Sequence, residues 1–188
     1  MTSTVSIAKV KGNAPDSVKR ILKDTKAFYA NRYPDQIKGP IWMQDVYNSA
    51  MDVVEVSVVK NDTHPTWEEG KVVVEVPVSQ DMLNAQGNVH NGCIITLIDM
   101  CSTLALHAVI LSKQEGEYVS VSQTMNIMYH NAVAGLGDVL SVVNTSLAIG
   151  DGGHSARTEI WSTKHRQLIA TGAQIKMVPS LPTPSSRM

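Results

Sequence analysis

Apolar and polar residues alternate in two early stretches of the chain, as they do in strands that are buried on one face. In residues 51–59, valines recur at every second position around Glu55 and Ser57, and residues 72–78 repeat the pattern with further valines. The turn-forming sequence at 61–65 separates the two stretches. The pattern therefore predicts two strands that pair as antiparallel neighbours.

A long apolar run follows, and its pattern differs from that of the strands. Residues 93–111 are apolar on nearly all sides of a helix, which predicts a helix over about 92–111 that other elements cover on several faces. The run is long enough to cross a membrane, but it contains Asp99 and His107. A central Asp costs about 2.5–3.5 kcal/mol on insertion scales. We therefore expect a buried core helix and no membrane span.

The rest of the chain contains four more stretches with the character of strands. They are expected at 117–130, 137–149, 154–164 and 167–178, and short Gly-rich or charged links, typical of antiparallel pairing, join them. Two strands, one long helix and a run of antiparallel strands predict an α+β fold. In this fold a curved antiparallel sheet wraps around a long central helix.

An extra helix is expected near the N-terminus. Asp16 or Ser17 can cap its start, apolar residues follow at helical spacing, and Pro34 ends it. The last ten residues hold three prolines and three serines, which predicts a flexible tail. The expected organisation is an N-terminal extension with one helix (1–48), a domain of sheet and helix (49–178) and a C-terminal tail (179–188).

Composition narrows the classes of function. The 188 residues are 43% hydrophobic and carry a net charge of −1, which fits one globular domain with a sizeable core. Lys and Arg form no stripe and aromatic residues make up only 5%, so no nucleic-acid partner is expected. Cys93 and Cys101 lie about 12 Å apart along one helix, too far for a disulfide bond. Unbridged cysteines and no hydrophobic signal segment in residues 1–15 favour an intracellular protein.

The candidate chemistry lies where a polar turn opens the apolar helix. Residues 84–92 are rich in Gly and Asn, and a helix that starts there presents free backbone N–H groups at its positive end. Asp99 follows inside the helix. A carboxylate that takes a proton from water and N–H groups that stabilise an oxyanion suit the hydrolysis of a thioester. Alternatively, Asp99 is a structural carboxylate that accepts hydrogen bonds from nearby hydroxyls, those of Thr96, Ser102 and Thr103.

Two segments resemble a known family. The sequence Asn84-Ala85-x-Gly87-x-x-His90-x-Gly92, with Asp99 seven residues later, is similar to the signature of the hotdog-fold acyl-CoA thioesterases, in particular the group of acyl-CoA thioesterase 13 and its PaaI-like relatives. Residues 119–129 carry a second match. The resemblance implies the hotdog fold, hydrolysis of an acyl-CoA substrate to a free acid and coenzyme A, and no cofactor, since coenzyme A is part of the substrate.

The resemblance also implies roles for individual residues. Asp99 directs the attacking water as a general base, with a nucleophilic role as the alternative. The backbone N–H of Asn91 is the main donor to the oxyanion. His90 and Asn84 match positions that hold the thioester or the water, and Ser122 matches a serine that helps to place the water.

Two positions need comment beyond this pattern. The family usually has glycine where this chain has Asn91; if that position requires a positive φ, Asn is the least costly substitute and keeps the N–H. Gly92 keeps the family glycine and is expected to bind substrate. In a regular strand Ser122 points away from the face that carries Gln123 and Tyr129. A β-bulge or a second copy of the chain is needed to reconcile this direction with its role.

One geometric conclusion does not depend on the resemblance. Asn91 and Asp99 are eight residues apart, about 12 Å along a helix, which is too far for both to touch one thioester carbon. Two copies about a twofold axis, with antiparallel helices, would place the start of one helix beside the middle of the other. We therefore expect a homodimer as the minimal active unit, and the resemblance implies a homotetramer.

Several alternatives stay open. A dehydratase or hydratase of hydroxyacyl thioesters and a non-catalytic acyl-binding module share the hotdog fold, and His90 could serve only as a helix cap. The histidines show no metal-ligand spacing, so no metal is expected. Residues 186–188 resemble a peroxisomal address, so we expect a cytoplasmic or peroxisomal location, with a mitochondrial one still open. The cations that could contact the phosphates of coenzyme A, or simply be solvated surface charges, are Arg157, Lys164, Arg166 and Lys176.

Overall fold

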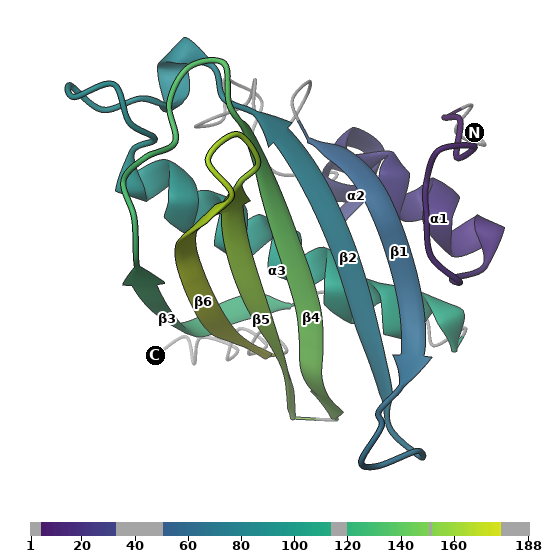
Figure 1. Ribbon diagram of the computed structural model, residues 1–188. Helices are drawn as coiled ribbons and strands as arrows, with labels where there is room; N and C mark the ends of the chain where they lie inside the picture. The colour runs from purple at the N-terminus through teal and green to yellow at the C-terminus, as the bar shows by residue number, and fades with distance from the viewer. Residues whose placement is uncertain (1–4, 33–50, 114–119, 151, 178–188) are drawn as a thin grey trace, which may run out of the picture.

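The computed structural model describes residues 5–32, 51–113, 120–150 and 152–177 (Figure 1). In chain order its elements are α1 (Asp16–Lys23), α2 (Thr25–Arg32), β1 (Asp52–Lys60), β2 (Glu68–Pro77), a short 3-10 helix η2 (Gln80–Met82), α3 (Asn91–Ser112), β3 (Val121–Tyr129), β4 (Val139–Gly150), β5 (Gly153–Ser162) and β6 (Gln167–Met177). The six strands and the long helix lie within a few residues of the ranges that the hydrophobic pattern predicts.

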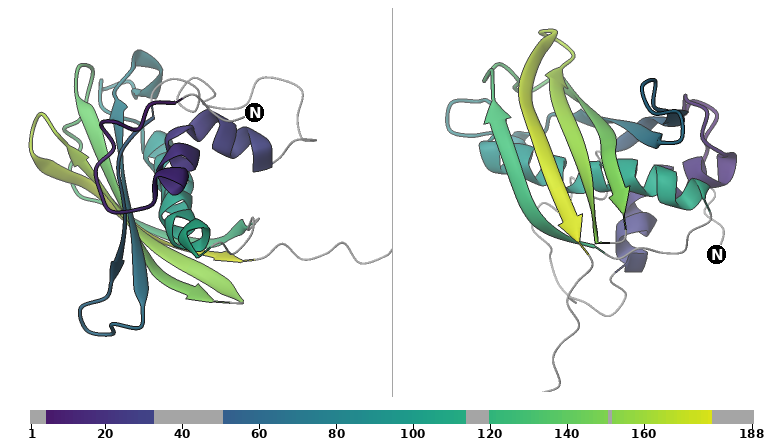
Figure 2. Two further views of the ribbon diagram at one scale, coloured as in Figure 1. Left: turned by 90° about the vertical axis from the view of Figure 1, so that its right-hand side faces the viewer. Right: turned by 90° about the horizontal axis from the view of Figure 1, so that it is seen from below.

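The six strands form one antiparallel sheet. Their order is β1-β2-β4-β5-β6-β3, and each neighbouring pair is antiparallel, including β1 with β2 as predicted. The sheet curves around α3, which packs against β2, β4 and β5 on the concave side (Figure 1 and Figure 2). The α+β hotdog fold expected from the sequence is therefore confirmed.

The core lies between α3 and the inner face of the sheet. Ile98 and Leu104 of α3 are fully buried, as are the inward valines of β2, namely Val72, Val74 and Val76. Among the described helices, α3 is long and apolar enough to cross a membrane by length and composition, but 78% of its apolar window is buried inside the protein. It is the core helix that the sequence predicts, and not a membrane span.

The prediction of one N-terminal helix is wrong, because the segment forms α1 and α2 with a break at Asp24. The backbone of Asp24, at φ −84° and ψ 68°, leaves the helical region. Its carboxylate accepts a hydrogen bond from the N–H of Ala27 at 3.0 Å, as an N-cap residue does. Asp side chains compete with helical hydrogen bonds in this way, so one residue starts a new helix.

Residues 11–14 cover the outer edge of β1. Lys11 forms two backbone hydrogen bonds with that strand, at 2.8 and 2.9 Å. The side-chain amide of Asn13 donates to the carbonyl of Val58 and accepts from its N–H, both at 2.8 Å. The opposite edge is β3, and within the described ranges no segment pairs with its outer side. An uncovered edge strand offers N–H and C=O groups to another chain.

Two glycines allow α3 to lie close to the sheet. A Cβ atom on Gly70 of β2 would come within 2.2 Å of the carbonyl oxygen of Ala105, and one on Gly172 of β6 within 2.7 Å of the Ile98 side chain. Because both separations are far below van der Waals contact, a side chain at Gly70 would require the helix to move, and one at Gly172 would require at least the Ile98 side chain to move. The approach at Gly172 matters for the site, because Asp99 follows Ile98.

Some expectations concern residues outside the described ranges. The predicted domain boundaries, at 48/49 and 178/179, both fall there, and so do the tail at 179–188 and its possible peroxisomal address. These stay predictions.

Replacing Gly70 by Ala should lower the free energy of unfolding by about 1–3 kcal/mol, because the new methyl group meets the backbone of α3. Gly150→Ala in β4 is the matched control: its Cβ would lie no nearer than 3.8 Å to its surroundings, so little or no loss is expected. Urea unfolding curves of both variants measure the difference. Equal midpoints would contradict the close packing of α3 on β2.

Candidate functional site

The carboxylate of Asp99 leaves the apolar helix toward the end of the sheet where β6 and β3 pair. Its Oδ1 atom accepts three hydrogen bonds: from Ser122 Oγ at 2.6 Å, from Gln174 Nε2 at 2.5 Å and from Lys176 Nζ at 3.0 Å. The side chain is 40% exposed, so its remaining surface faces solvent. Asp99 is thus a tethered and accessible carboxylate, as a reacting group requires.

Two of these donors come from β6 and were not assigned to the site by the sequence. Gln174 and Lys176 point inward and are buried, whereas Ile175 between them and Ala173 before them point outward. Gln174 Oε1 in turn accepts a hydrogen bond from Ser102 of α3. The sequence carried a signal, since polar residues sit at alternate positions of a strand whose other positions are apolar, but it did not show which face was inside.

Lys176 is buried beside Asp99 and does not lie on the surface as expected. We considered it as a surface cation for the phosphates of coenzyme A, yet its side chain is only 7% exposed and forms an ion pair with Asp99. The expectation that Lys176 is a surface cation is wrong.

A β-bulge gives Ser122 its direction. The pairing of β3 with β6 runs from Ser122 opposite Lys176 to Thr124 opposite Ile175, so the register shifts by one residue at Gln123. Ser122 then shares a face with Lys176 and reaches Asp99. The conflict between strand alternation and the expected position of Ser122 is resolved by a bulge, one of the two solutions that the sequence left open.

The environment of Asp99 favours its charged form. Burial raises the pKa of the carboxyl, but the charge of Lys176 and the hydrogen bonds from Ser122, Gln174 and Lys176 outweigh it, so the pKa lies below its ordinary value. Asp99 is accordingly ionised at neutral pH. It can accept a proton or attack as an anion.

The hydroxyls of Thr96, Ser102 and Thr103, which were the alternative donors to a purely structural Asp99, do not bind its carboxylate. Thr103 donates to the backbone carbonyl of Asp99 at 3.1 Å, and Thr96 donates to that of Gly92 at 2.9 Å. The one hydroxyl hydrogen of Ser102 is within reach of the Asp99 carbonyl, at 3.2 Å, and of Gln174 Oε1. Such bonds to the preceding turn are common for Ser and Thr in helices. The partners of the Asp99 carboxylate come from the sheet instead.

The start of α3 is the second half of the candidate site. His90 is the N-cap residue, and its Nδ1 accepts the N–H of Gly92 at 2.9 Å. The N–H of Asn91 donates to no acceptor in the described part of the chain. Asn91 does not adopt a positive φ, so the family glycine is not needed here for conformational reasons. Because the Gly92 N–H is engaged by the cap, the free donor at this helix end is that of Asn91.

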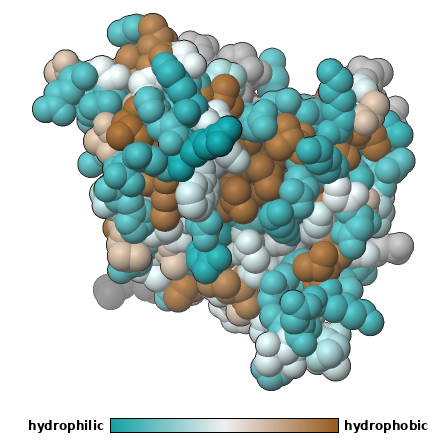
Figure 3. Space-filling model, in the orientation of Figure 1, coloured by the Kyte–Doolittle hydropathy of each residue, from teal (hydrophilic) through white to brown (hydrophobic). Residues whose placement is uncertain are grey.

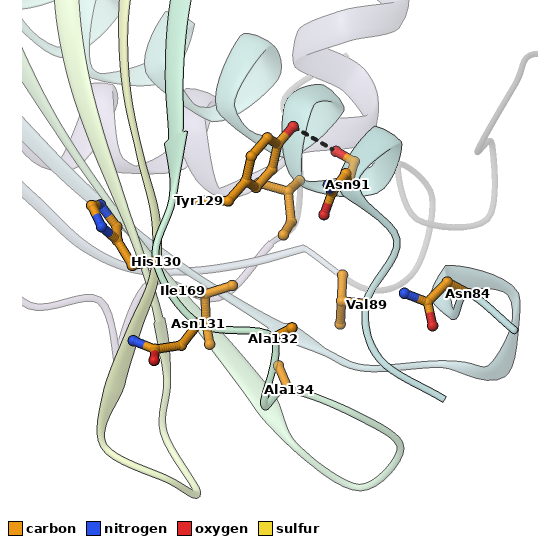
Figure 4. Close-up of a pocket in the computed structure, with 10 residues that line it drawn as sticks. Asn84, Val89, Asn91, Tyr129, His130, Asn131, Ala132, Ala134 and Ile169 are labelled. Carbon is orange, nitrogen blue, oxygen red and sulfur yellow. Dashed lines mark hydrogen bonds between the residues drawn. The ribbon is translucent and has the colours of Figure 1, made fainter. Parts of the chain in front are cut away.

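A pocket of about 210 Å³ lies beside this helix start (Figure 4). Asn84, Asn91 and Tyr129 line it, and the Tyr129 hydroxyl donates to the carbonyl of Asn91 at 3.4 Å. Asn84 holds the preceding turn, since its Oδ1 accepts the N–H groups of Gln86 and Asn88 at 2.9 and 3.2 Å. The pocket does not include Asp99.

One chain therefore contains both halves of the site without joining them. His90, Asn84 and Asn91 gather at the start of α3, while Asp99 and Ser122 gather eight residues further along the helix, about 12 Å away.

The two cysteines take no part in this chemistry. Cys93 and Cys101 are free and buried in α3. Burial raises the pKa of Cys93 to about 12 and raises the pKa of Cys101 as well, so neither forms a thiolate at neutral pH. Among the residues that the structure describes, no group of three or more His, Cys, Asp or Glu side chains could hold a metal ion.

Comparisons with known proteins agree with this fold. Residues 86–172 match the family model of the Thioesterase superfamily. The structure is similar to that of zebrafish thioesterase superfamily member 2, with a TM-score of 0.58 and 27% identity over 82% of this chain and 95% of the other. It is also similar to thioesterase superfamily member 2 of Mus musculus, with a TM-score of 0.50 and 28% identity over 58% and 81% of the two chains.

The sequence has curated relatives as well. Acyl-coenzyme A thioesterase 13 of Homo sapiens is 36% identical over 109 residues, which make up 57% of this chain and 72% of the human protein. At that identity and coverage, this chain belongs to the thioesterase superfamily.

Proposed function

We propose that this protein hydrolyses acyl-CoA thioesters to a free acid and coenzyme A. The tethered, ionised and accessible carboxylate of Asp99 carries the proposal. The acyl-CoA substrate is supported by the name of the human relative, an acyl-coenzyme A thioesterase that matches over most of its length.

In the proposed reaction, Asp99 takes a proton from a water molecule as the water oxygen attacks the thioester carbon. The electron pair of the C=O bond moves to the oxygen, and the Asn91 N–H at the positive end of α3 stabilises the resulting oxyanion. When the oxyanion collapses, the C–S bond breaks and the thiolate of coenzyme A leaves. The thiolate then takes up the proton that Asp99 received, so the carboxylate is restored.

The other expected residues are given supporting roles. His90 accepts a hydrogen bond at Nδ1, so a neutral imidazole carries its hydrogen on Nε2 and can donate it to the thioester. Asn84 lines the pocket at the same helix end, and its amide Nδ2 is available to hold substrate or water. Gly92 contributes by leaving room next to the Asn91 N–H. Ser122 acts on the water through Asp99.

The proposed active unit is a homodimer, because one chain keeps Asp99 and the Asn91 N–H about 12 Å apart. The edges of the sheet support this choice. Residues 11–14 cover the edge at β1, whereas β3 is exposed along its length and ends in Met128 and Tyr129, which are 57% and 43% exposed. Pairing of β3 with β3 of a second copy would bring the two α3 helices side by side in opposite directions.

The outer face of the sheet supports a further association of dimers into a homotetramer. This face, which Figure 3 shows, carries exposed apolar side chains at its surface, among them Leu147, Trp161 and Ile175. A second dimer packed on this face would cover these apolar side chains.

Replacing Asp99 by Asn should reduce turnover of acyl-CoA by about 10²- to 10⁴-fold while the fold is retained, because the amide cannot take a proton from water. Release of the thiol from a panel of acyl-CoAs measures the effect, and circular dichroism checks the fold. Asp62→Asn, on the exposed turn between β1 and β2, is the control and should leave turnover unchanged.

The same panel separates the proposal from its rivals. Equal turnover by the wild type and Asp99→Asn would remove Asp99 from the mechanism. Addition of water to an enoyl thioester without thiol release would indicate a hydratase. Tight binding with no turnover of any acyl-CoA would indicate a binding module.

The two-copy site can be tested by mixing two inactive variants. Asn91→Pro deletes the N–H proposed for the oxyanion and should keep the helix, because Asn91 is the first residue of α3, where proline is well tolerated, and His90 has the extended backbone that precedes proline. Asn91→Ala, which keeps the N–H, is the control. Mixed and re-associated with Asp99→Asn, the Pro variant should recover about a quarter of wild-type turnover, because half of the dimers then hold one intact site of two. A mixture that stays inactive would contradict a shared site.

A further inference from the structure

Lys176 is a buried cation, and the proposed reaction assigns no role to it. Its side chain is 7% exposed, and its ammonium group lies 3.0 Å from Asp99 Oδ1 and 3.1 Å from Ser122 Oγ. Burying a charge is costly unless it is paired, and the pair with Asp99 is partly open to solvent. A buried apolar residue would be the less costly choice for stability alone.

We propose that Lys176 is a positioning residue which, together with Gln174, fixes the Asp99 carboxylate so that Oδ1 is anchored to the sheet and only Oδ2 faces the reacting water. This inference rests on the proposed thioester hydrolysis and deepens it. Positions 174 and 176 lie outside the two segments that resemble the family.

The polar groups around Asp99 form a connected set of hydrogen bonds. Gln174 Nε2 lies within hydrogen-bond distance of both Asp99 Oδ1 and Ser122 Oγ, and its Oε1 accepts from Ser102. Ser122 Oγ accepts from Gln174 and from Lys176, so its single hydrogen goes to Asp99 Oδ1. Neither group can turn toward the water without breaking a bond.

The same hydrogen bonds show which oxygen of the Asp99 carboxylate is free. Oδ1 receives three donors, and Oδ2 has no hydrogen-bond partner within the described ranges. A carboxylate with neither oxygen anchored could rotate and present either of them, so only part of its population would be aligned for proton transfer. Anchoring fixes that alignment before substrate binds, which is the condition for an efficient general base.

The surrounding groups determine how the site responds to pH. From β6, Lys176 faces Asp99 directly, and from β5, His154 lies opposite Lys176 in the sheet register. From α2, the Tyr29 hydroxyl donates to the carbonyl of Met100, next to Asp99. Among these groups, it is the charge of Lys176 that lowers the pKa of Asp99. Without it, burial would raise that pKa, and protonation would switch off the base at a higher pH.

The test compares Lys176→Met with the control Lys60→Met, an exposed lysine at the end of β1. We expect kcat of Lys176→Met to fall by about 10- to 100-fold with little change in KM, and the acid limb of its pH profile to move to higher pH. The control should match the wild type in both respects. Unchanged kcat and an unchanged acid limb in Lys176→Met would overturn the inference.

A double variant separates positioning from a general structural role. If Lys176 acts through Asp99, then adding Lys176→Met to Asp99→Asn should not lower the residual turnover further. A further loss of the same 10- to 100-fold would mean that Lys176 only supports the structure, and would also overturn the inference. Lys176→Gln, which removes the charge but keeps an amide donor, replaces the Met variant if the latter does not fold, and the same shift of the acid limb is expected.

A measurement without substrate keeps this inference separate from the proposed function. In an NMR titration of ¹³C-labelled aspartate, the Asp99 carboxyl should titrate at higher pH in Lys176→Met than in the wild type. If no acyl-CoA is hydrolysed by the wild type, the proposed function fails while this shift still tests the role of Lys176. If the wild type is active and the shift is missing, only the inference fails.

Discussion

The structure depends on one contact between a charged side chain of the helix and polar side chains of the sheet. A carboxylate in the middle of an apolar helix is costly to bury, and the hydroxyls of α3 do not satisfy it, because they bond backbone carbonyls and Gln174 instead. Gly172 lets the helix approach β6 closely, and inward Gln174 and Lys176 then meet Asp99. The inward polar residues of β6 and the bulge in β3 both serve this contact, because they bring Gln174, Lys176 and Ser122 to Asp99.

The same contact explains why the proposed site needs a second chain. The sheet fixes Asp99 at one point along α3, and the free N–H of Asn91 belongs to the end of the helix, so a rigid helix keeps the two apart. The N-terminal segment covers one edge of the sheet and leaves β3 as the opposite edge. Among the described residues no segment covers β3, the edge beside Asp99, and this favours the proposed association there.

The sequence predicted most of the fold, and of the residues that meet around the Asp99 carboxylate it assigned Ser122 to the site but not Gln174 and Lys176. Alternating valines defined β1 and β2, and the apolar run defined α3, because burial on one face or on all faces leaves a periodic signal. The break at Asp24 was missed, since helical spacing continues across a residue that caps a new helix. Lys176 was misplaced because alternation in β6 identifies two faces but not which of them is inside, and the burial of Gln174 and Lys176 shows that theirs is the inner one. Asp99 was found because a carboxylate in an apolar helix requires an explanation.

The central claim is that Asp99 of one copy and the start of α3 of another act on the same thioester carbon. A crystal structure with a non-hydrolysable acyl-CoA analogue, in which a ketone replaces the thioester, tests it most directly. We predict the ketone oxygen within about 3 Å of the Asn91 nitrogen of one copy and the ketone carbon facing Asp99 Oδ2 of the other. An analogue held by a single copy, or with its carbonyl carbon remote from every Asp99, would contradict the account.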